Sequence, residues 1–312
     1  LSALGFMSGT SGDGVDTSVI SSNGKDIIDI KYNRFDPYPK NLSNKIHRVK
    51  ENISERQDLL RYSSDIEDLE LQVTNFHADI ANKVIKEINF DLIGFHGHTI
   101  YHNSGEKISK QIGLGVDLSK ITKKIVVYNF RQNDIKNGGE GAPLSPIYHA
   151  ALIKNLFSEN KVKTPISILN IGGIANITEI DKDFKITSRD IGPGNCLIDM
   201  WVRKNSDKLF DENGNFADKG KIDKFIFDQY LENFYYSKIN SKRSLDTNDF
   251  DISFAKGLSL ENGTATITNL TSELLSKKIG TNDIYICGGG RKNKFLINSL
   301  KSKVKNKIFL ID

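Results

Sequence analysis

Short apolar runs, broken by turns of small residues, dominate the pattern of hydrophobic and polar positions along the chain. The first run, a turn at 9–14 and the alternating stretches 15–22 and 26–32 predict an antiparallel meander. A helix opened by Pro39 should follow. The longest helix is expected over 64–88, where apolar residues recur every three or four positions: Ile66, Leu69, Val73, Phe76, Ile80 and Val84. We expect this apolar stripe to pack in a core.

The rest of the pattern alternates strands and helices, which indicates an α/β fold. Strands are predicted at 91–95 and 124–130, followed by a long loop over 131–145 and a helix from Pro146. A second strand–turn–strand unit at 166–178 repeats the opening design, which suggests an internal duplication. Further helices are expected at 196–205, 261–279 and 293–304, strands at 283–286 and 308–311, and surface excursions at 208–220 and 237–251.

The turns of small residues are candidate phosphate sites. Glycine lacks a Cβ, so a ligand can lie against the main chain, and the N–H groups of such a turn can face phosphate oxygens. Carboxylates in the first turn would repel a phosphate unless Mg²⁺ lies between them. The first candidate set is Gly9, Thr10, Ser11, Gly12, Asp13, Gly14, Val15 and Asp16, with Ser8 as a further hydroxyl. An ordinary glycine-rich hairpin is the alternative.

Two polar segments follow predicted strands, and ligands bind at the carboxyl ends of strands in open α/β sheets. Arg131 and Asp134 come after the strand at 124–130. The strand at 91–95 delivers His96, His98, Thr99 and His102. Three histidines invite a metal interpretation, but no Cys or carboxylate completes a ligand set nearby. We therefore expect ligand or structural contacts here and no transition metal.

Composition narrows the class of protein. The formal net charge is +4 and no block of like charge stands out, so neither nucleic acid nor a membrane is an expected partner. No apolar run reaches spanning length and no signal peptide is visible. Two cysteines, Cys196 and Cys287, make no disulfide framework, which favours a cytoplasmic protein.

Six segments, in this order, resemble the anhydro-N-acetylmuramic acid kinase family: MSGTSGDGVD, GFHGHTIYH, FRQNDIKNGGEGAPLSP, NIGGIANIT, DIGPGN and CGGGRKN. The resemblance spans essentially the whole chain. It implies a two-domain actin-like ATPase fold, a duplicated ribonuclease H-like α/β architecture with a nucleotide cleft between domains at 1–130 and 131–312. It also implies a reaction in cell-wall recycling. Water opens the anhydro bridge of 1,6-anhydro-N-acetylmuramic acid, and ATP phosphorylates the 6-oxygen to give N-acetylmuramic acid 6-phosphate.

The resemblance also assigns roles by position. It implies that Asp134 is the catalytic base, with Arg131 beside it. Mg²⁺ is expected at Asp13 and Asp190, directly or through water. The remaining matches are 9–16 with Gly172, Gly173 and Asn176 for the ATP phosphates, Gly288, Gly289 and Gly290 for the adenosine, and His96, His98 and Thr99 for the sugar.

Three positions depart from the family's usual pattern. His98 stands where the family usually has Gln, Asn129 where it has Asp, and Gly12 where it has a larger apolar residue. The first bears on sugar contacts, and the second removes a charge near the expected base. The chain also ends before the family's closing helix, for which a partial sequence is the simpler explanation.

Two other functions stay open. One is a different sugar or carboxylate kinase, because a fold does not fix a substrate. The other is an inactive nucleotide-binding scaffold, although carboxylates at Asp13, Asp134 and Asp190 speak against it. The expected partners are a small-molecule sugar and ATP, and a homodimer is the candidate oligomer.

Overall fold

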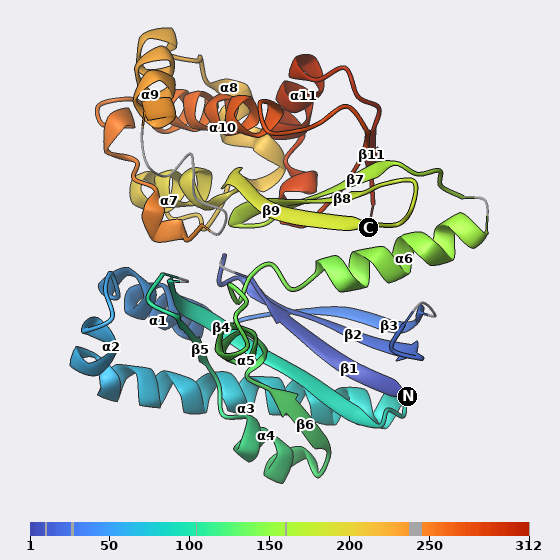
Figure 1. Ribbon diagram of the computed structural model, residues 1–312. Helices are drawn as coiled ribbons and strands as arrows, with labels where there is room; N and C mark the ends of the chain where they lie inside the picture. The colour runs from blue at the N-terminus through green and yellow to red at the C-terminus, as the bar shows by residue number, and fades with distance from the viewer. Residues whose placement is uncertain (10, 26–27, 104, 160, 237–244, 312) are drawn as a thin grey trace. The chain divides into compact units, whose positions relative to one another are not determined.

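The computed structural model describes residues 1–9, 11–25, 28–103, 105–159, 161–236 and 245–311 (Figure 1). Thr10, a predicted phosphate-binding residue, and the part 237–244 of the excursion predicted over 237–251 lie outside the described residues. The chain forms two compact units, Leu1–Leu144 with Ala151–Ser158, and Ser145–Ala150 with Glu159–Asp312. The division expected after residue 130 lies earlier in the chain than this one.

The first unit contains a sheet of six strands in the order β3-β2-β1-β4-β5, with β6 also paired to β4. Strands β1 to β3 form the predicted antiparallel meander, and β4 runs parallel to β1. The first half of β4 pairs in parallel with β6, and its second half pairs antiparallel with β5. The strands are β1 (Ser2–Ser8), β2 (Gly14–Ser22), β3 (Ile28–Pro37), β4 (Leu92–Asn103), β5 (Ile108–Ile112) and β6 (Ile125–Tyr128).

The second unit contains a sheet of five strands in the order β11-β10-β7-β8-β9. Its strands are β7 (Ile166–Ile171), β8 (Ile174–Ile180), β9 (Ile186–Pro193), β10 (Asp283–Cys287) and β11 (Ile308–Leu310). Strands β7 to β9 form an antiparallel meander, and β10 runs parallel to both β7 and β11. The same order and directions relate β3, β2, β1, β4 and β6. This repeat confirms the predicted duplication and the ribonuclease H-like character of each half.

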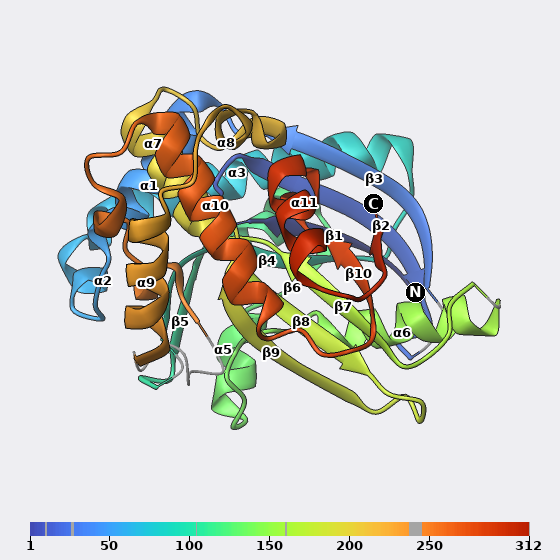
Figure 2. The same ribbon diagram turned by 90° about the horizontal axis from the view of Figure 1, so that it is seen from above.

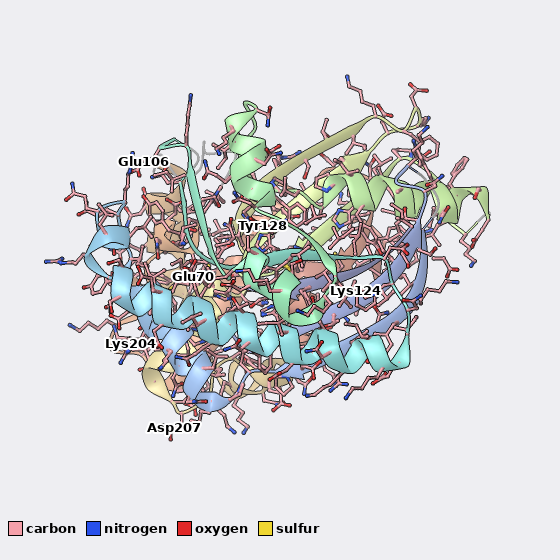
Figure 3. The ribbon with its side chains drawn as sticks, turned by 90° about the horizontal axis from the view of Figure 1, so that it is seen from below. Glu70, Glu106, Lys124, Tyr128, Lys204 and Asp207 are labelled. Carbon is pink, nitrogen blue, oxygen red and sulfur yellow. The ribbon has the colours of Figure 1, made fainter. Side chains whose placement is uncertain are left out.

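Helix α3 (Ser63–Glu87) carries the apolar stripe predicted from the sequence and runs along one face of the first sheet (Figures 1 and 3). The stripe is buried, with Phe76 partly so. Glu70, labelled in Figure 3, also faces inward and pairs with Lys110 of β5 at 2.7 Å. The other helices of this unit are α1 (Lys40–Asn52), α2 (Asp58–Arg61), α4 (Gly115–Thr122) and α5 (Phe130–Lys136).

In the second unit, α10 (Leu260–Ser276) crosses between α9 and α11 (Figure 2). Its close packing on α7 depends on Gly263, where a Cβ would overlap the ring of Trp201. The indole N–H of Trp201 donates to the Leu260 carbonyl at 3.0 Å. The neighbouring helices are α7 (Cys196–Asn205), α8 (Asn215–Lys219), α9 (Lys224–Tyr236) and α11 (Lys294–Lys303), with short 3₁₀ turns η1 (Glu212–Gly214), η3 (Thr247–Asp249), η4 (Ser253–Ala255) and η5 (Gly289–Lys292).

Helix α6 (Pro146–Ser158) is shared by the two units, which divide it between Ala150 and Ala151. Asn155 donates to the Ile28 carbonyl of β3 at 3.0 Å. His149 contacts the Thr178 hydroxyl of β8 at 3.0 Å. None of the helices that the structure describes is both long and apolar enough to cross a membrane.

Three expectations from the sequence were wrong. Strand β4 continues through His102, so the histidines lie within a strand and not beyond its end. The segment after β6 is a helix, α5, and not a loop from residue 131. The expected surface excursion over 208–220 includes a helix, α8, which packs on α10. Buried Asp211 holds the start of this helix, since its carboxylate accepts the backbone N–H groups of Phe216 and Ala217 at 2.7 and 3.2 Å.

Candidate active site

The first phosphate hairpin joins β1 to β2 and is held by main-chain contacts. The N–H of Gly12 donates to the Gly9 carbonyl at 3.0 Å, which closes the turn. The Ser43 hydroxyl of α1 donates to the Gly12 carbonyl at 2.7 Å. The N–H of Tyr38 donates to the Asp13 carbonyl at 2.9 Å. The hairpin is therefore closed by its own main chain and tied to α1 and to the segment between β3 and α1.

Glycine suits the positions of this hairpin for different physical reasons. Gly12 has φ of 60°, and a Cβ there would lie 3.0 Å from His47 Nε2. The imidazole thus fills the space in which a larger residue 12 would lie. At Gly14, a Cβ would come within 2.5 Å of the Asp36 carbonyl. The overlap with backbone means that the fold requires Gly14, whereas at Gly12 the positive φ favours glycine. At Gly9 the nearest atom would be 3.6 Å away, so packing among the described residues leaves that position open to a ligand.

The side chains around the hairpin do not all face a ligand. The carboxylate of Asp13 accepts the Ser11 hydroxyl at 2.5 Å, and the Asp16 side chain is exposed on β2. Val15 is fully buried in the core, so only its main chain can take the predicted role. The Ser8 hydroxyl was expected at the phosphate but is buried, 2.8 Å from both His98 Nδ1 and the Tyr38 hydroxyl.

A β-bulge at Gly97 separates the two predicted sugar histidines. Residues Phe6 and Ser8 of β1 pair with Phe95 and His98 of β4, so β4 carries one extra residue there. Gly97 has φ of 72°, and a Cβ would overlap the Ile112 carbonyl. Because side chains alternate along a strand, the extra residue sends His98 to the same face as Phe95.

That face is the one covered by α3. The ring of Phe95 contacts the ring of His77 on α3, with centroids 5.1 Å apart. His98 is fully buried, and burial holds its pKa well below the usual value. His96 points to the opposite face, where α5 lies: Phe130 of α5 would be 3.9 Å from a Cβ on Gly94. The structure therefore brings His96, and not His98, to the segment that carries Arg131.

His96 and Arg131 form a defined pair. The Arg131 Nε–H donates to His96 Nε2 at 2.7 Å. The other nitrogen, Nδ1, lies 2.9 Å from the Gly97 carbonyl and therefore carries the proton. Burial, assisted by the Arg131 charge, lowers the pKa of His96 to about 4. The imidazole is therefore neutral near pH 7 and serves as an acceptor that orients the arginine.

Asp134 lies one turn after Arg131 on α5, so the two share a helix face. Its Oδ2 accepts the N–H of Gly141 at 2.8 Å. A Cβ on Gly139 would overlap the carboxylate, so the following loop wraps closely around it. Within the described part of the chain, Oδ1 accepts no hydrogen bond. One oxygen thus fixes the carboxylate and the other stays available to a ligand.

Asn129 precedes this helix in the left-handed conformation, with φ of 65° and ψ of 35°. Asn and Asp are the residues besides Gly that adopt it most readily. Asn129 therefore suits this turn, and it carries no charge, unlike the Asp that the resemblance led us to expect. Thr99, the third residue expected at the sugar, accepts the Gln111 side chain of β5 at 3.3 Å.

The second phosphate hairpin joins β7 to β8. The carbonyl groups of this hairpin accept hydrogen bonds from the residues just before α7. The N–H of Asn195 donates to the Gly172 oxygen at 2.7 Å, and that of Gly194 to the Gly173 oxygen at 2.9 Å. Asn176 follows on β8, and its buried Oδ1 has no hydrogen-bond partner among the described residues. The N–H groups of the turn and this amide oxygen are therefore polar groups that a ligand could satisfy.

Asp190 lies beside Asn176, since the two residues are cross-strand partners on β9 and β8. Its side chain is 9% exposed, and its Oδ2 accepts the N–H of Leu245 at 2.8 Å. Asp13 belongs to the first unit and Asp190 to the second. No group of three or more His, Cys, Asp or Glu side chains with metal-binding geometry occurs among the residues that the structure describes.

The third glycine motif follows β10. Gly288 has φ of 81° and packs on β7, where a Cβ would lie 2.5 Å from Asn170 Oδ1. At Gly290 a Cβ would overlap the side chain of Ile171. At Gly289, by contrast, the nearest atom is Asn195 Nδ2 at 3.8 Å. Gly289 is thus the member of the motif that packing leaves open.

Sequence patterns did not indicate Tyr38, Ser43 or the Ser8–His98 contact, which together hold the first hairpin. Ser8 and His98 are separated by 90 positions, and Tyr38 and Ser43 lie outside every motif. Such contacts depend on strand pairing and bulges and leave no local signature. Only the hydroxyl of Ser8 was visible in advance, as part of the glycine-rich segment.

Comparisons with known proteins address the whole chain. The family model described as anhydro-N-acetylmuramic acid kinase matches residues 2–309. The anhydro-N-acetylmuramic acid kinase of Pelagibacter ubique is 43% identical over 99% of this chain and 84% of its own. That of Rhizobium johnstonii is 35% identical over 95% of this chain and 81% of its own.

Among solved structures, the activator of 2-hydroxyisocaproyl-CoA dehydratase from Clostridium difficile, with bound ADPNP, aligns with all of this chain and 88% of its own. The TM-score is 0.42 and the identity 12%, so this likeness adds nothing to the argument. The family model and the two relatives cover the glycine hairpins, the His96–Arg131 pair and the Asp134 loop alike. The chain is therefore a member of the anhydro-N-acetylmuramic acid kinase family.

Proposed function

We propose that the protein is an ATP-dependent kinase of 1,6-anhydro-N-acetylmuramic acid, which it converts with water to N-acetylmuramic acid 6-phosphate in cell-wall recycling. The observation that carries the proposal is family membership over the whole chain, with 43% identity to a protein named for this activity. The geometry of Asp134 supports it, because one carboxylate oxygen is anchored and the other is available. A reaction that consumes ATP also fits a cytoplasmic protein.

Opening an acetal bridge with water requires a group that accepts a proton from that water. Asp134 Oδ1 is our candidate acceptor. The Gly141 N–H fixes Oδ2, so the carboxylate keeps one orientation as the proton arrives. The departing 6-oxygen needs an electrophile, and the γ-phosphoryl group of ATP provides one. Two carboxylic acids, as in ordinary glycosidases, are then unnecessary.

Arg131 is our candidate for holding the sugar or its developing charge near Asp134. Neutral His96 accepts from Nε of the guanidinium and so restricts its rotation. A guanidinium offers five N–H donors in a planar fork, which suits carboxylate and phosphate groups. The lactyl carboxylate of a muramic acid and the transferred phosphoryl group are both anions of this kind.

The remaining residues suit a nucleotide. Gly9, Gly172 and Gly289 have room for a ligand against the main chain, and Asn176 offers an unpaired amide oxygen. Carboxylates are ligands that Mg²⁺ prefers, so Asp13 and Asp190 are each candidate ligands for the ion, directly or through water. When bound, Mg²⁺ would neutralise phosphate charge. A homodimer stays a prediction, which light scattering on the purified protein would test.

The test is Asp134→Asn. The amide oxygen of Asn can still accept from the Gly141 N–H, so the loop keeps its shape while the proton acceptor is lost. Turnover should fall at least about 10²-fold, while the affinities for MgATP and the anhydro sugar stay within about threefold. Near-normal turnover would exclude Asp134 as the base. A large loss of sugar affinity with normal turnover would make it a binding residue.

Isotope labelling separates this reaction from simple phosphoryl transfer. In H₂¹⁸O, the label should enter the anomeric hydroxyl of the product and not the phosphate ester, and the anomeric configuration should be inverted. Mass spectrometry and proton NMR read these two outcomes. Phosphorylation of a different sugar without bridge opening would favour another sugar kinase. Nucleotide binding without any transfer would favour a scaffold.

A further inference from the structure

His98 and Ser8 form a buried contact between β4 and the first phosphate hairpin. Ser8 is the last residue of β1 and immediately precedes Gly9. The Ser8 Oγ lies 2.8 Å from His98 Nδ1 and 2.8 Å from the Tyr38 hydroxyl. His98 is fully buried and Ser8 is 4% exposed. The contact is therefore shielded from water, where hydrogen bonds fix geometry well.

The hydrogen-bond pattern assigns the proton of His98. Its Nε2 is buried and has no partner within the residues that the structure describes. A buried N–H without an acceptor is costly, so the proton of the neutral ring belongs on Nδ1. Nδ1–H then donates to the Ser8 Oγ, whose second contact is with the Tyr38 hydroxyl. Burial keeps the pKa of His98 far below its usual value, so the neutral ring persists at neutral pH.

Tyr38 extends this contact to the other end of the hairpin. Its hydroxyl meets Ser8, and its backbone N–H donates to the Asp13 carbonyl at 2.9 Å. The two ends of the hairpin, Ser8 and Asp13, are thus held by one residue. The ring of Tyr38 is itself fixed against Phe76 of α3, with centroids 4.8 Å apart. His98 is the buried donor that completes this clamp from the β4 side.

We propose that His98 is a positioning residue for the nucleotide, acting through Ser8 on the hairpin at 9–13 and making no contact with the sugar. The proposal rests on the proposed function in that ATP phosphates bind this hairpin. A Gln at position 98 would carry an amide N–H₂ that can donate the same bond. His98 would then be a different donor for the same task.

The experiment compares His98→Leu, His98→Gln and, as a control, His77→Leu. His77 is an equally buried histidine of the same core, but its Nδ1 contacts the Val73 carbonyl of α3 and not the hairpin. Titration calorimetry with Mg²⁺ and a non-hydrolysable ATP analogue should give about a tenfold weaker Kd for His98→Leu. The Gln variant should stay within about threefold of the wild type, and so should the His77 control.

Turnover gives the second readout. His98→Leu should raise KM for ATP while kcat at saturating ATP and KM for the sugar change little. Amide hydrogen exchange over residues 8–14 should rise in His98→Leu and not in His77→Leu. An unchanged Kd and unchanged exchange would overturn the proposal, as would equal effects of the two Leu variants. A larger change in the sugar KM would make His98 a sugar contact.

The two hypotheses fail in different ways. If the wild type does not bind the MgATP analogue, the proposed function fails, while the exchange measurement still decides whether His98 holds the hairpin. If the wild type binds the analogue and the His98→Leu variant binds it equally well, only the positioning role fails.

Discussion

Individual glycines in the three small-residue motifs have separable roles. Gly14, Gly288 and Gly290 are required by the fold, because a Cβ at each position would overlap a neighbouring side chain or carbonyl oxygen. Gly9, Gly172 and Gly289 meet nothing closer than 3.4 Å. These are the three positions at which we propose that the nucleotide lies against the main chain. Substitutions at the first group of positions should therefore affect folding, and substitutions at the second group should affect ligand binding.

Gly289→Val should therefore weaken nucleotide use without unfolding the protein. We expect KM for ATP to rise about tenfold, or ~1.4 kcal/mol of binding free energy, because the added side chain occupies the space proposed for adenosine. Steady-state kinetics at varied ATP and thermal unfolding would measure the two effects. Gly290→Val is the matched control and should reduce folded yield. If Gly289→Val changed only the KM for the sugar, the motif would lie at the sugar site and not at the adenosine.

Buried histidines give the protein a predictable sensitivity to acid. Burial lowers the pKa of His77 from 6.5 to about 4. Between these values the unfolded chain binds a proton that the folded chain does not, so the free energy of unfolding falls as pH falls. The contribution of neutral His77 to the free energy of unfolding is fully present above pH 6.5. As the pH falls towards 4, the free energy of unfolding decreases by about 3 kcal/mol on account of this residue.

His77→Phe should make the free energy of unfolding less dependent on pH. Urea unfolding at pH 7 and at pH 4.5 would be compared for both proteins. The decrease between the two pH values should be smaller in the variant by about 2–3 kcal/mol, because one titrating group has been removed. Comparing differences cancels the contributions of the other histidines. Equal decreases in both proteins would show that His77 is not the group concerned.

Among the elements, α5 differs most from its sequence-based expectation. The signals for a loop at 138–146, with three glycines and two prolines, outweighed the short helix before them. The helix ends at Asn137, whose backbone N–H donates to carbonyls of the last turn, and Asp134 Oδ2 then accepts the N–H of Gly141 from the following loop. The glycines therefore belong to the loop that wraps around Asp134. Gly139 leaves room for the carboxylate, and the N–H of Gly141 donates to it.

Gly139→Ala should consequently act on catalysis through Asp134. The new methyl group would overlap the carboxylate and displace it from its anchored position. We expect kcat to fall at least about tenfold, since small displacements of a reacting group are costly. Because Gly139 is exposed, the free energy of unfolding should change by less than about 1 kcal/mol. Glu140→Ala, at the exposed next position, is the control, and equal kcat values for both variants would contradict the argument.

Periodic elements could be read from the sequence, whereas face assignment could not. The stripe of α3 and the strands of the first meander, with β7 and β8 of the second, were predicted because their apolar residues recur at helix or strand spacing. The direction of His96 and His98 depends on one bulge, which a two-residue period does not reveal. The sequence therefore predicted the segments that carry the candidate site residues. It did not predict their hydrogen-bond partners, such as Tyr38 for Ser8, which are seen only in the structure.

At the scale of the whole molecule, each unit has its own hydrophobic core. Leu69 and Ile93 lie in the first core, and Leu270 and Ile286 in the second. The two sheets repeat the same strand order and direction around these cores. Separate cores mean that a cavity in one unit removes contacts from that unit alone. Stability should therefore be partly separable between the halves of the duplication.

Leu270→Ala tests this separation. Removing a fully buried Leu should cost about 2–5 kcal/mol. Amide hydrogen exchange should then rise in β7, β8, β10 and α10, while α3, β1 and β4 keep wild-type protection. Leu69→Ala is the mirror experiment in the first core. Equal loss of protection in both units from either variant would show that the molecule unfolds as one cooperative body.

The bulge at Gly97 also affects how the protein can evolve. Two imidazoles that are two positions apart in a regular strand would share one face, and a change in one would crowd the other. Here His96 and His98 lie on opposite faces, so each can be exchanged without disturbing the neighbours of its counterpart. With the positioning role that we propose for His98, selection could adjust nucleotide affinity at 98 while the arginine partner at 96 stays fixed. One strand thereby offers two independently adjustable positions.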